Sequence, residues 1–341
     1  MSNPFAPLLN TLLDGGDLTE ADASSLMHAM ASGDMAPALG GAFLAGLRAK
    51  GETAEEIRGF ATAMRELAVK PDIPEGTPTV DTVGTGGDGS GSLNLSTGTG
   101  LLAAACGVRV VKHGNRSISS KSGSADMLEV LGMPLPLDKD ASVAALAATG
   151  FTFLFAPAFH PAMKEIMPVR GALGVRTVFN MLGPLTNPGA PPFQLIGAFS
   201  ADAAKLMADT LAGMPIERAF VVHGEPGWDE ASPAGDFLLY DVTPGKVTER
   251  RRSPEDYGVE RCAPEALKGG DAAHNAHELE RVFSGDDKGA HRDALLMGTS
   301  LVLEVMGEVS TATEGVERAA AAIDDGSAQA FLERFREHFA D

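Results

Sequence analysis

Aromatic side chains and cysteines are scarce in this sequence. Only 6% of its 341 residues are aromatic, and there are two cysteines, Cys106 and Cys262. Two isolated cysteines exclude both a disulfide framework and a zinc site built from cysteines. Cys106 ends the apolar run 101–106, which predicts a buried free thiol. With few aromatics and 40 glycines, the core must come from small aliphatic side chains on closely packed helices.

Positive charge and long apolar runs are also lacking. Lys and Arg number 27 against 46 Asp and Glu, a net charge of −19, and such a chain is repelled by nucleic acid and by anionic membranes. No apolar run reaches the roughly 18 residues of a membrane-spanning helix. The first residues lack the basic region and apolar core of a signal peptide. We therefore expect a cytoplasmic protein with small-molecule substrates and neither a nucleic-acid nor a membrane partner.

The order of local signals predicts the fold class. Two capping-box patterns, at 19–22 and 53–56, precede apolar residues at helical spacing, so residues 1–70 are expected to be helical. After the Pro-rich linker 71–78, short strand-like segments alternate with helical ones. The strands are expected at 79–83, 108–112, 151–155, 194–199 and 219–223, and the helices at 97–106, 124–131, 142–149 and 201–211. This alternation predicts a small all-α domain followed by a large α/β domain, whose central, mostly parallel sheet is flanked by helices.

A glycine-rich loop follows the first expected strand. Residues 84–92 read Gly-Thr-Gly-Gly-Asp-Gly-Ser-Gly-Ser, and the next helix is expected to start near Ser96 and Thr97. Backbone N–H groups of such a loop, together with the positive end of a helix dipole, favour a phosphate group. The glycines also fit a loose dinucleotide pattern, but no acidic residue for the ribose occurs between Gly89 and Asp126. A Walker loop is excluded because no Lys-Ser/Thr pair follows.

A second polar loop follows the next expected strand. Residues 112–124 contain Lys112, Arg116 and Lys121 and no carboxylate, in a strongly acidic chain. Cations and hydroxyl groups on a flexible backbone suit a phosphate or pyrophosphate. The alternative is a solvated basic loop with no ligand.

These loops and the motifs after them resemble one enzyme family closely. Residues 84–97 and 112–129 are similar to the paired signatures of anthranilate phosphoribosyltransferases, and the similarity continues through 159–164, 168–170, 174–177 and 179–188. The resemblance extends from the N-terminal helices to near the C-terminus. It implies transfer of the phosphoribosyl group of phosphoribosyl pyrophosphate to the amine of anthranilate, with release of pyrophosphate, in tryptophan biosynthesis.

The resemblance also implies how the chain is organised. Residues 1–70 and about 168–188 would form the small helical domain, and about 71–167 with 189–341 the large α/β domain. The active site would lie in the cleft at the hinge between them, and the helical domains would pair the two subunits of a homodimer.

Site residues are implied position by position. Those matching the phosphoribosyl pyrophosphate site are Gly84, Gly87, Asp88, Ser92, Asn94, Leu95, Ser96, Thr97, Lys112, His113, Gly114, Asn115, Arg116, Ser117, Ile118, Ser119, Ser120 and Ser124. Positions matching anthranilate contacts are Gly84, Asn115 and Arg170. His113 and His160 lie on the anthranilate side in the family, although lone histidines are more often structural. No side chain is expected to act as general acid or base.

A pair of carboxylates completes the expected site. Asp229 and Glu230 follow an expected strand in a Gly/Pro loop, an arrangement that suits Mg²⁺ because this ion prefers oxygen ligands and shares its shell with substrate phosphates. An adjacent Asp and Glu are ordinarily solvent-exposed surface residues without a ligand, but the residues on either side of this pair match the family's metal motif. With Ser96 these residues are expected to bind Mg²⁺, as two ions per monomer.

Two other functional classes remain as alternatives. A pyrimidine nucleoside phosphorylase of the same fold carries Lys-His-Ser-Thr before the glycines, where this chain has 81–83, Asp-Thr-Val. A non-catalytic, nucleic-acid-binding relative should be basic and lack the paired carboxylates. Within the resemblance the chain departs at Gly171-Ala172, at Trp228 and at 297–299, and none of these removes a residue matched to the chemistry.

Overall fold

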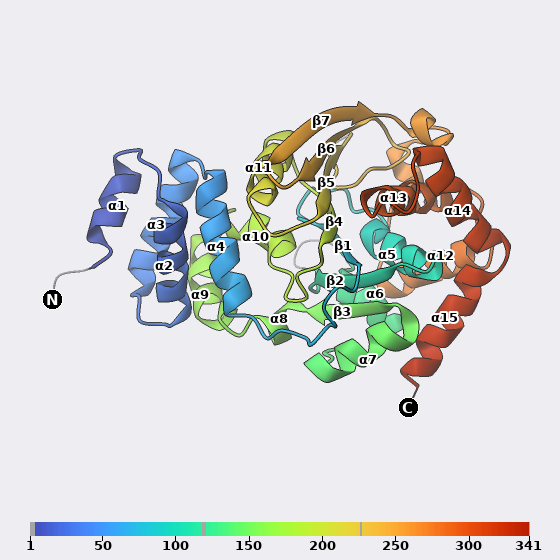
Figure 1. Ribbon diagram of the computed structural model, residues 1–341, viewed down its shortest axis with the longest axis horizontal. Helices are drawn as coiled ribbons and strands as arrows, with labels where there is room; N and C mark the ends of the chain where they lie inside the picture. Colours follow the sequence, from blue (N-terminus) through green and yellow to red (C-terminus); the bar gives the residue numbers. More distant parts are fainter. Residues whose placement is uncertain (1–3, 118–120, 226, 341) are drawn as a thin grey trace.

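The computed structural model describes residues 4–117, 121–225 and 227–340. Ile118, Ser119 and Ser120, three residues expected at the phosphoribosyl pyrophosphate site, lie outside these ranges. Four helices come first: α1 (Ala6–Leu13), α2 (Glu20–Ala31), α3 (Pro37–Lys50) and α4 (Ala54–Glu66). Thr19 and Thr53 cap α2 and α4 through their hydroxyl groups, and the full capping box forms at Thr53 with Glu56. The helices pack at one end of the molecule (Figure 1).

The rest of the chain builds one seven-stranded sheet. Its strands are β1 (Thr79–Gly84), β2 (Arg109–Gly114), β3 (Phe151–Phe155), β4 (Phe193–Gly197), β5 (Arg218–Gly224), β6 (Phe237–Thr243) and β7 (Lys246–Arg252). The order across the sheet is β3-β2-β1-β4-β5-β6-β7; the first five strands are parallel, and β6 and β7 are antiparallel. The expected α/β class is therefore confirmed, and β6 and β7 were not predicted.

Helices cover both faces of the sheet (Figure 1). The helices that follow the N-terminal four in the described ranges are α5 (Leu95–Ala105), α6 (Ser124–Val130), α7 (Lys139–Thr149), α8 (Ala156–Phe159), α9 (Met163–Leu173), α10 (Phe179–Leu185), α11 (Ala201–Ala212), α12 (Ala272–Phe283), α13 (Ala290–Val305), α14 (Ala312–Asp324) and α15 (Ser327–His338), and all but α9 belong to the layers around the sheet. Two short 3-10 helices, Pro254–Tyr257 and Pro264–Leu267, precede α12.

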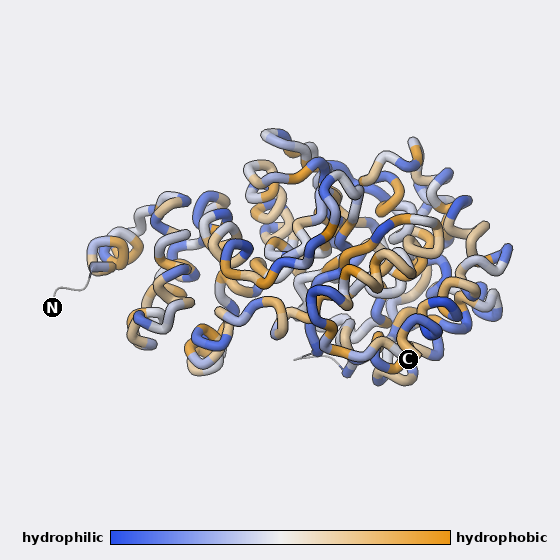
Figure 2. The backbone as a smooth tube through the Cα atoms, turned by 60° about the horizontal axis from the view of Figure 1, so that its bottom comes forward, coloured by the Kyte–Doolittle hydropathy of each residue, from blue (hydrophilic) through white to orange (hydrophobic). Residues whose placement is uncertain are grey.

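Two large apolar clusters hold the molecule together. One joins α5, α6 and α12–α15 to one face of the sheet, through side chains such as Phe151, Leu295 and Phe331. The other is continuous from the N-terminal helices through α10 and α11 to the opposite face, where Ile196 and Val221 lie. Apolar segments accordingly run through the interior of the larger part, with hydrophilic segments around it (Figure 2). The helical bundle and the sheet thus share a core.

The segment 163–185 lies against the N-terminal helices although it is distant from them in sequence. Helix α9 packs on α2 and α3, and α10 packs on α4. No helix within the described ranges has the length and apolar character to cross a membrane. Cys106 is a free thiol as expected but is only partly buried, which corrects that prediction: it ends α5, where the chain turns toward the surface.

Candidate active site

The candidate site lies where the strand order reverses. From β1 the chain proceeds outward to β2 and β3 and then returns to β4 on the other side of β1. Adjacent parallel strands whose connections leave in opposite directions open a crevice at their carboxyl ends, where ligands bind in such sheets. The glycine-rich loop leaves β1 at this edge, the second loop leaves β2, and the carboxylate pair follows β5.

Three glycines at this edge make room for Asp229 and Glu230. Strands β1, β4 and β5 end at Gly84, Gly197 and Gly224. A Cβ atom on Gly84 would overlap the Asp229 carboxylate, one on Gly197 the Asp229 carbonyl, and one on Gly224 the Glu230 carbonyl. The absence of side chains at three neighbouring strand ends therefore lets the carboxylate segment cross the sheet edge beneath the first loop.

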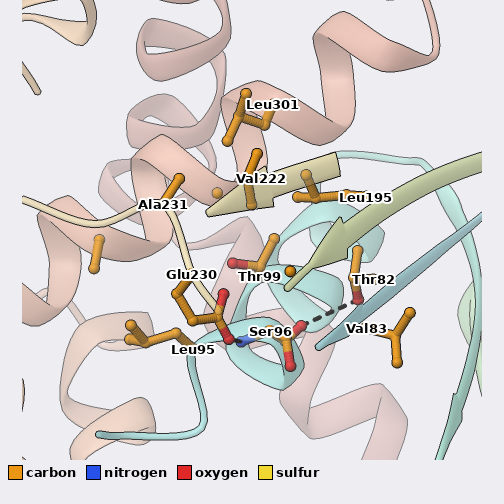
Figure 3. A pocket seen from close by; sticks show the side chains of 13 residues that line it. Thr82, Val83, Leu95, Ser96, Thr99, Leu195, Val222, Glu230, Ala231 and Leu301 are labelled. Atoms are coloured by element: carbon orange, nitrogen blue, oxygen red, sulfur yellow. Dashed lines mark hydrogen bonds between the residues drawn. The ribbon is translucent and has the colours of Figure 1, made fainter. Parts of the chain in front are cut away.

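Asp229 is buried and Glu230 is partly buried, and both are bonded to the backbone of the first loop and of α5. Oδ2 of Asp229 accepts the N–H of Gly86 at 2.6 Å, and Oε1 of Glu230 accepts the N–H of Ser96 at 3.1 Å. The side chain of Asp88 in turn accepts the N–H of Asp229 at 3.3 Å. Figure 3 shows Glu230 bonded to Ser96, whose carbonyl accepts the Thr82 hydroxyl at 3.1 Å. The N-terminus of α5, expected to attract an anion, already holds Glu230.

Burial makes the negative charges of this cluster costly. Burial, and then the Asp88 carboxylate, raise the pKa of Asp229 to about 7. The pKa of Glu230 is also raised well above its usual value, by burial and then by the charge of Asp229. A cation placed between the carboxylates would favour their ionised forms. Binding of a cation would therefore relieve the unfavourable electrostatic energy of the ionised carboxylates.

The donor set fits Mg²⁺ shared with a substrate. Among the residues that the structure places, no three His, Cys, Asp or Glu side chains form a complete metal cage. Two carboxylates and the hydroxyl of Ser96 are instead what Mg²⁺ uses when waters and substrate phosphates fill the remaining positions. The site residues therefore suit a metal that arrives with an anionic ligand.

The first loop is held by several parts of the molecule. The N–H of Thr85 donates to the Gly197 carbonyl at 2.9 Å, and its hydroxyl accepts the N–H of Phe199 at 3.0 Å. Gly86 donates to Asp229, as described above, and the carbonyl of Gly87 accepts a hydrogen bond from Arg176. Gly86 and Gly87 both adopt positive φ angles, 67° and 72°, which explains the glycines there.

Two of the three cations of the second loop, Lys112 and Arg116, are already engaged. Lys112 is buried and donates to the Thr82 carbonyl and, at 3.3 Å, to the Ser96 hydroxyl. Burial lowers the pKa of Lys112, while Asp81, Glu230 and Asp229 oppose that shift. Lys112 therefore lies beneath the carboxylate cluster, where the three carboxylates favour its charged form and its burial opposes it.

Arg116 turns toward α6 and not toward the first loop. Its guanidinium makes two hydrogen bonds to Glu129, at 2.5 and 2.6 Å, and one to Asp126 at 2.9 Å. The same Asp126 carboxylate accepts the N–H groups of Ser117, at 3.3 Å, and Gly123, at 2.8 Å, which lie on either side of the loop tip. Helix α6 thereby closes the base of this loop.

Asn94 connects the two loops. Its Oδ1 accepts the Ser122 hydroxyl at 3.0 Å and the Nδ2 of Asn275, in α12, at 2.7 Å, and its Nδ2 donates to the Ser122 carbonyl at 3.2 Å. Sequence reasoning missed Asn275, which lies 181 residues from Asn94 in the chain. The other expected residues lie on the same two loops or the elements beside them: Ser92, Leu95, Thr97, Gly114, Asn115 and Ser124.

Two histidines lie side by side next to α10. The rings of His113 and His160 are 5.0 Å apart, and His113 Nδ1 is 3.1 Å from the Gly183 carbonyl of α10. Burial lowers the pKa of His113 to about 3 and that of His160 to about 4. Arg65, on α4, donates to the neighbouring Leu185 carbonyl at 2.8 Å. The C-terminal end of α10 is therefore held by side chains from both the helical bundle and the sheet.

Arg170 lies in the last turn of α9. Its guanidinium is 5.1 Å from the ring centre of Phe179, and its nearest polar contact is the sulfur of Met167 at 3.9 Å. Within the described ranges it forms no ion pair with a carboxylate, and partial burial lowers its pKa. A guanidinium in this state retains its paired donors for an external anion.

Comparison with known proteins agrees with this arrangement. Residues 76–329 match the family model described as glycosyl transferase family, a/b domain, and residues 6–68 match the helical bundle domain of the same family. The fold and these two matches thus define a glycosyl transferase with a helical bundle and an α/β domain.

Within that class, similar relatives and solved structures are anthranilate phosphoribosyltransferases. The anthranilate phosphoribosyltransferase of Solibacter usitatus is 47% identical over 326 residues, 95% of each chain. The solved structure of the enzyme from Thermus thermophilus superposes with a TM-score of 0.91 at 40% identity, covering 98% of this chain and 99% of that one. The Saccharomyces cerevisiae enzyme, solved with phosphoribosyl pyrophosphate and Mg, gives 0.88 at 27% identity, covering 97% and 96%. The chain belongs to the anthranilate phosphoribosyltransferase family.

Proposed function

We propose that this enzyme transfers the phosphoribosyl group of 5-phosphoribosyl 1-pyrophosphate to the amine of anthranilate. The products are N-(5-phosphoribosyl)anthranilate and pyrophosphate, in the second step from chorismate in tryptophan biosynthesis. The observation that carries the proposal is the carboxylate pair beneath a glycine-rich loop at the point where the strand order reverses. It combines a cation site and backbone N–H groups, both of which a pyrophosphate leaving group requires.

The leaving group is the first chemical demand on the site. As the bond between ribose C1 and the pyrophosphate oxygen breaks, its electron pair leaves with the pyrophosphate. Ser96, Asp229 and Glu230 would hold Mg²⁺, which would neutralise the negative charge that develops on the pyrophosphate. We propose two ions per monomer, since Asp88 adds a third carboxylate beside Asp229. The N–H groups of the first loop, fixed by the contacts of Thr85, Gly86 and Gly87, are oriented before the reaction and need no rearrangement.

The acceptor makes a weaker demand. The amine of anthranilate attacks C1 from the face opposite to the pyrophosphate, the new C–N bond forms, and the amine loses one proton to solvent. An aromatic amine is unprotonated at neutral pH, so no strong general base is needed. We assign the acceptor carboxylate to Arg170, whose guanidinium has no carboxylate partner in the described ranges. Catalysis is then mainly the positioning of two substrates.

Apart from Arg116, the proposed ligands follow the expectation from sequence. For phosphoribosyl pyrophosphate it comprises residues of both loops and of the start of α5, and for anthranilate it comprises Gly84, Asn115 and Arg170. The contacts of Arg116 with Glu129 and Asp126 place that guanidinium at the base of its loop, so we propose an indirect role for it. His113 and His160 would line the acceptor side.

We further propose a cytoplasmic homodimer formed by the helical part, residues 1–70 with about 168–188. The packing of α9 on α2 and α3 supports this grouping. Apolar side chains exposed on the same part, Leu13, Val69 and Val175, support a subunit contact there. Sedimentation at micromolar concentration should give the mass of a dimer, and a monomer would contradict the proposal.

The decisive assay uses the fluorescence of anthranilate. In the presence of phosphoribosyl pyrophosphate and Mg²⁺ it should decay, and excess chelator should stop the decay. Pyrimidine nucleoside with phosphate should yield no free base, which tests the alternative phosphorylase activity. Steady fluorescence with both substrates and Mg²⁺ present would contradict the proposed function.

A further inference from the structure

Arg176 reaches from the helical side of the cleft to the first loop. It lies in the connection between α9 and α10, and its Nη2 donates to the carbonyl of Gly87. Its guanidinium also lies 4.2 Å from the ring centre of Phe199, just after β4. The side chain therefore bridges the segment that packs on the N-terminal helices and the sheet edge where the candidate active site lies.

The backbone of Arg176 is fixed from the opposite side. Nη1 of Arg48, on α3, donates to the Arg176 carbonyl at 2.5 Å. The next residue, Thr177, donates its N–H to Oδ1 of Asn180 at 3.0 Å, in the first turn of α10. Ring stacking and backbone contacts restrict the rotamers of Arg176, so the entropy cost of its hydrogen bond to Gly87 is already met by the fold.

The contact controls the direction of one peptide group. Because a peptide unit is planar and trans, the carbonyl of Gly87 and the N–H of Asp88 point in opposite directions. With the carbonyl turned toward Arg176, the N–H of Asp88 faces away from it. Gly87 has a φ of 72°, and glycine crosses readily between the two signs of φ, so its own preference does not fix this orientation. Thr85 and Gly86 on one side are already tied to β4 and Asp229.

We propose that Arg176 is a positioning residue for the donor site: it orients the Gly87–Asp88 peptide so that the loop N–H groups are presented to the pyrophosphate. The inference rests on the proposed function and deepens it, since it assigns control of the donor loop to a residue of the helical part. Arg176 acts through Gly87 and touches no reacting atom. Its position within the motif 174–177 was visible in the sequence, but its target was not, because Gly87 lies 89 residues away.

The test is the division of effects between the two substrates. Arg176→Ala should raise the KM for phosphoribosyl pyrophosphate about tenfold, the usual consequence of losing one charge-assisted hydrogen bond, and leave the KM for anthranilate within about twofold. Arg176→Lys should recover part of the loss, because an ammonium group can donate to the Gly87 carbonyl but does not stack on Phe199 as a guanidinium does.

Arg318→Ala is the matched control, because Arg318 also donates to a backbone carbonyl, that of Cys106, at 2.9 Å but lies far from the loops. Arg318→Ala should change the melting temperature about as much as Arg176→Ala does, but it should leave the KM values for both substrates unchanged. A rise in the KM for anthranilate alone, or equal effects of Arg176→Ala and Arg318→Ala, would overturn the inference. A wild-type enzyme without turnover would instead refute the proposed function, and calorimetric titration of pyrophosphate with Mg²⁺ would still compare the donor loop in wild type and variant.

Discussion

The two loops of the candidate site differ in how their charges are arranged. The first loop has no basic residue and contains the carboxylate of Asp88, yet it lies above two further carboxylates, those of Asp229 and Glu230, whose pKa values are raised. The second loop carries three cations, but Lys112 is buried and Arg116 is paired with α6, whereas Lys121 is exposed. Behind it lie His113 and His160, whose pKa values are lowered.

This difference contrasts two ways in which a phosphate can be bound, through a metal ion held by carboxylates or directly by basic side chains. At the first loop the anion would be bound through a metal and backbone N–H groups, which explains a carboxylate cluster at a site for an anionic substrate. At the second loop, Arg116 stabilises the loop through its pair with Glu129, and Lys112 lies close to the carboxylates of the cluster. Neither cation is therefore freely available to a ligand. Counting cations in a loop sequence therefore overestimates how many are available to a ligand.

The largest expected effect comes from removing the charges beneath the first loop. Asp229→Asn with Glu230→Gln should reduce turnover by at least about a thousandfold at saturating Mg²⁺, because the charge stabilisation of the leaving group is lost. The fold should persist, since buried carboxylates with raised pKa values destabilise the metal-free protein at neutral pH. Initial rates and circular dichroism measure the two effects.

A surface pair provides the control for that variant. Asp286→Asn with Asp287→Asn makes a similar change in charge after α12, at one exposed and one partly exposed position, and should leave turnover unchanged. More than a tenth of wild-type turnover in the Asp229/Glu230 variant would show that the first loop does not depend on a metal held by these side chains.

The next largest effect concerns the acceptor. Arg170→Ala should lower kcat/KM for anthranilate by about 30- to 1,000-fold, the cost of about 2–4 kcal/mol for a lost charge-assisted contact. The KM for phosphoribosyl pyrophosphate should change little. Arg334→Ala, which removes another arginine lying over a phenylalanine ring, is the control. A selective rise in the KM of the donor would assign Arg170 to the phosphate site instead.

The histidines behind the second loop predict an acid sensitivity. Their folded-state pKa values, about 3 and about 4, lie below the unfolded value near 6.5, so folding favours their neutral forms. The stability they contribute is complete above about pH 6.5 and is lost as pH falls toward the folded-state values. At pH 5 the free energy of unfolding should be lower by about 2 kcal/mol for each histidine than it is above pH 6.5.

Denaturant unfolding at pH 7.5 and pH 5 measures this effect. His160→Gln should reduce the difference between the two pH values by about 2 kcal/mol, whereas His277→Gln, at an exposed position of α12, should not change it. Identical differences in wild type and His160→Gln would mean that the ring is protonated in the folded protein.

The smallest effect tests the base of the second loop. Glu129→Gln removes the carboxylate that binds Arg116 through two hydrogen bonds, in a partly exposed pair. Such pairs contribute about 1 kcal/mol or less, so the KM for phosphoribosyl pyrophosphate should rise no more than about fivefold. Glu280→Gln, which removes the partner of Arg336, is the control. A fall in KM would indicate that Glu129 withholds Arg116 from the donor.

Much of the fold could be predicted from the sequence because its signals are local. Helix caps at Thr19 and Thr53 and the alternation of strands and helices after residue 78 depend on neighbours within a few residues. The antiparallel strands β6 and β7 were missed, because alternation of strands and helices indicates only parallel connections and these two form a hairpin.

The site was less accessible to sequence reasoning because its contacts are long-range. The glycines at the ends of β1, β4 and β5 make room for one segment only when the three strands lie side by side. The engagement of Arg116 depends on which way a side chain turns, and the role of Asn275 on a contact across most of the chain. Local patterns identify such residues as polar or small and give no indication of their partners.

The most direct measurement of the central claim is metal binding at the carboxylate pair. Mn²⁺, a paramagnetic substitute for Mg²⁺ with similar oxygen ligands, can be titrated into the protein with phosphoribosyl pyrophosphate and followed by electron paramagnetic resonance. The complex of wild-type protein with phosphoribosyl pyrophosphate should bind Mn²⁺ more tightly than phosphoribosyl pyrophosphate does alone in solution. The Asp229→Asn/Glu230→Gln variant should lose this additional affinity. Equal binding by the two proteins would contradict the account, because the metal would then be held without Asp229 and Glu230.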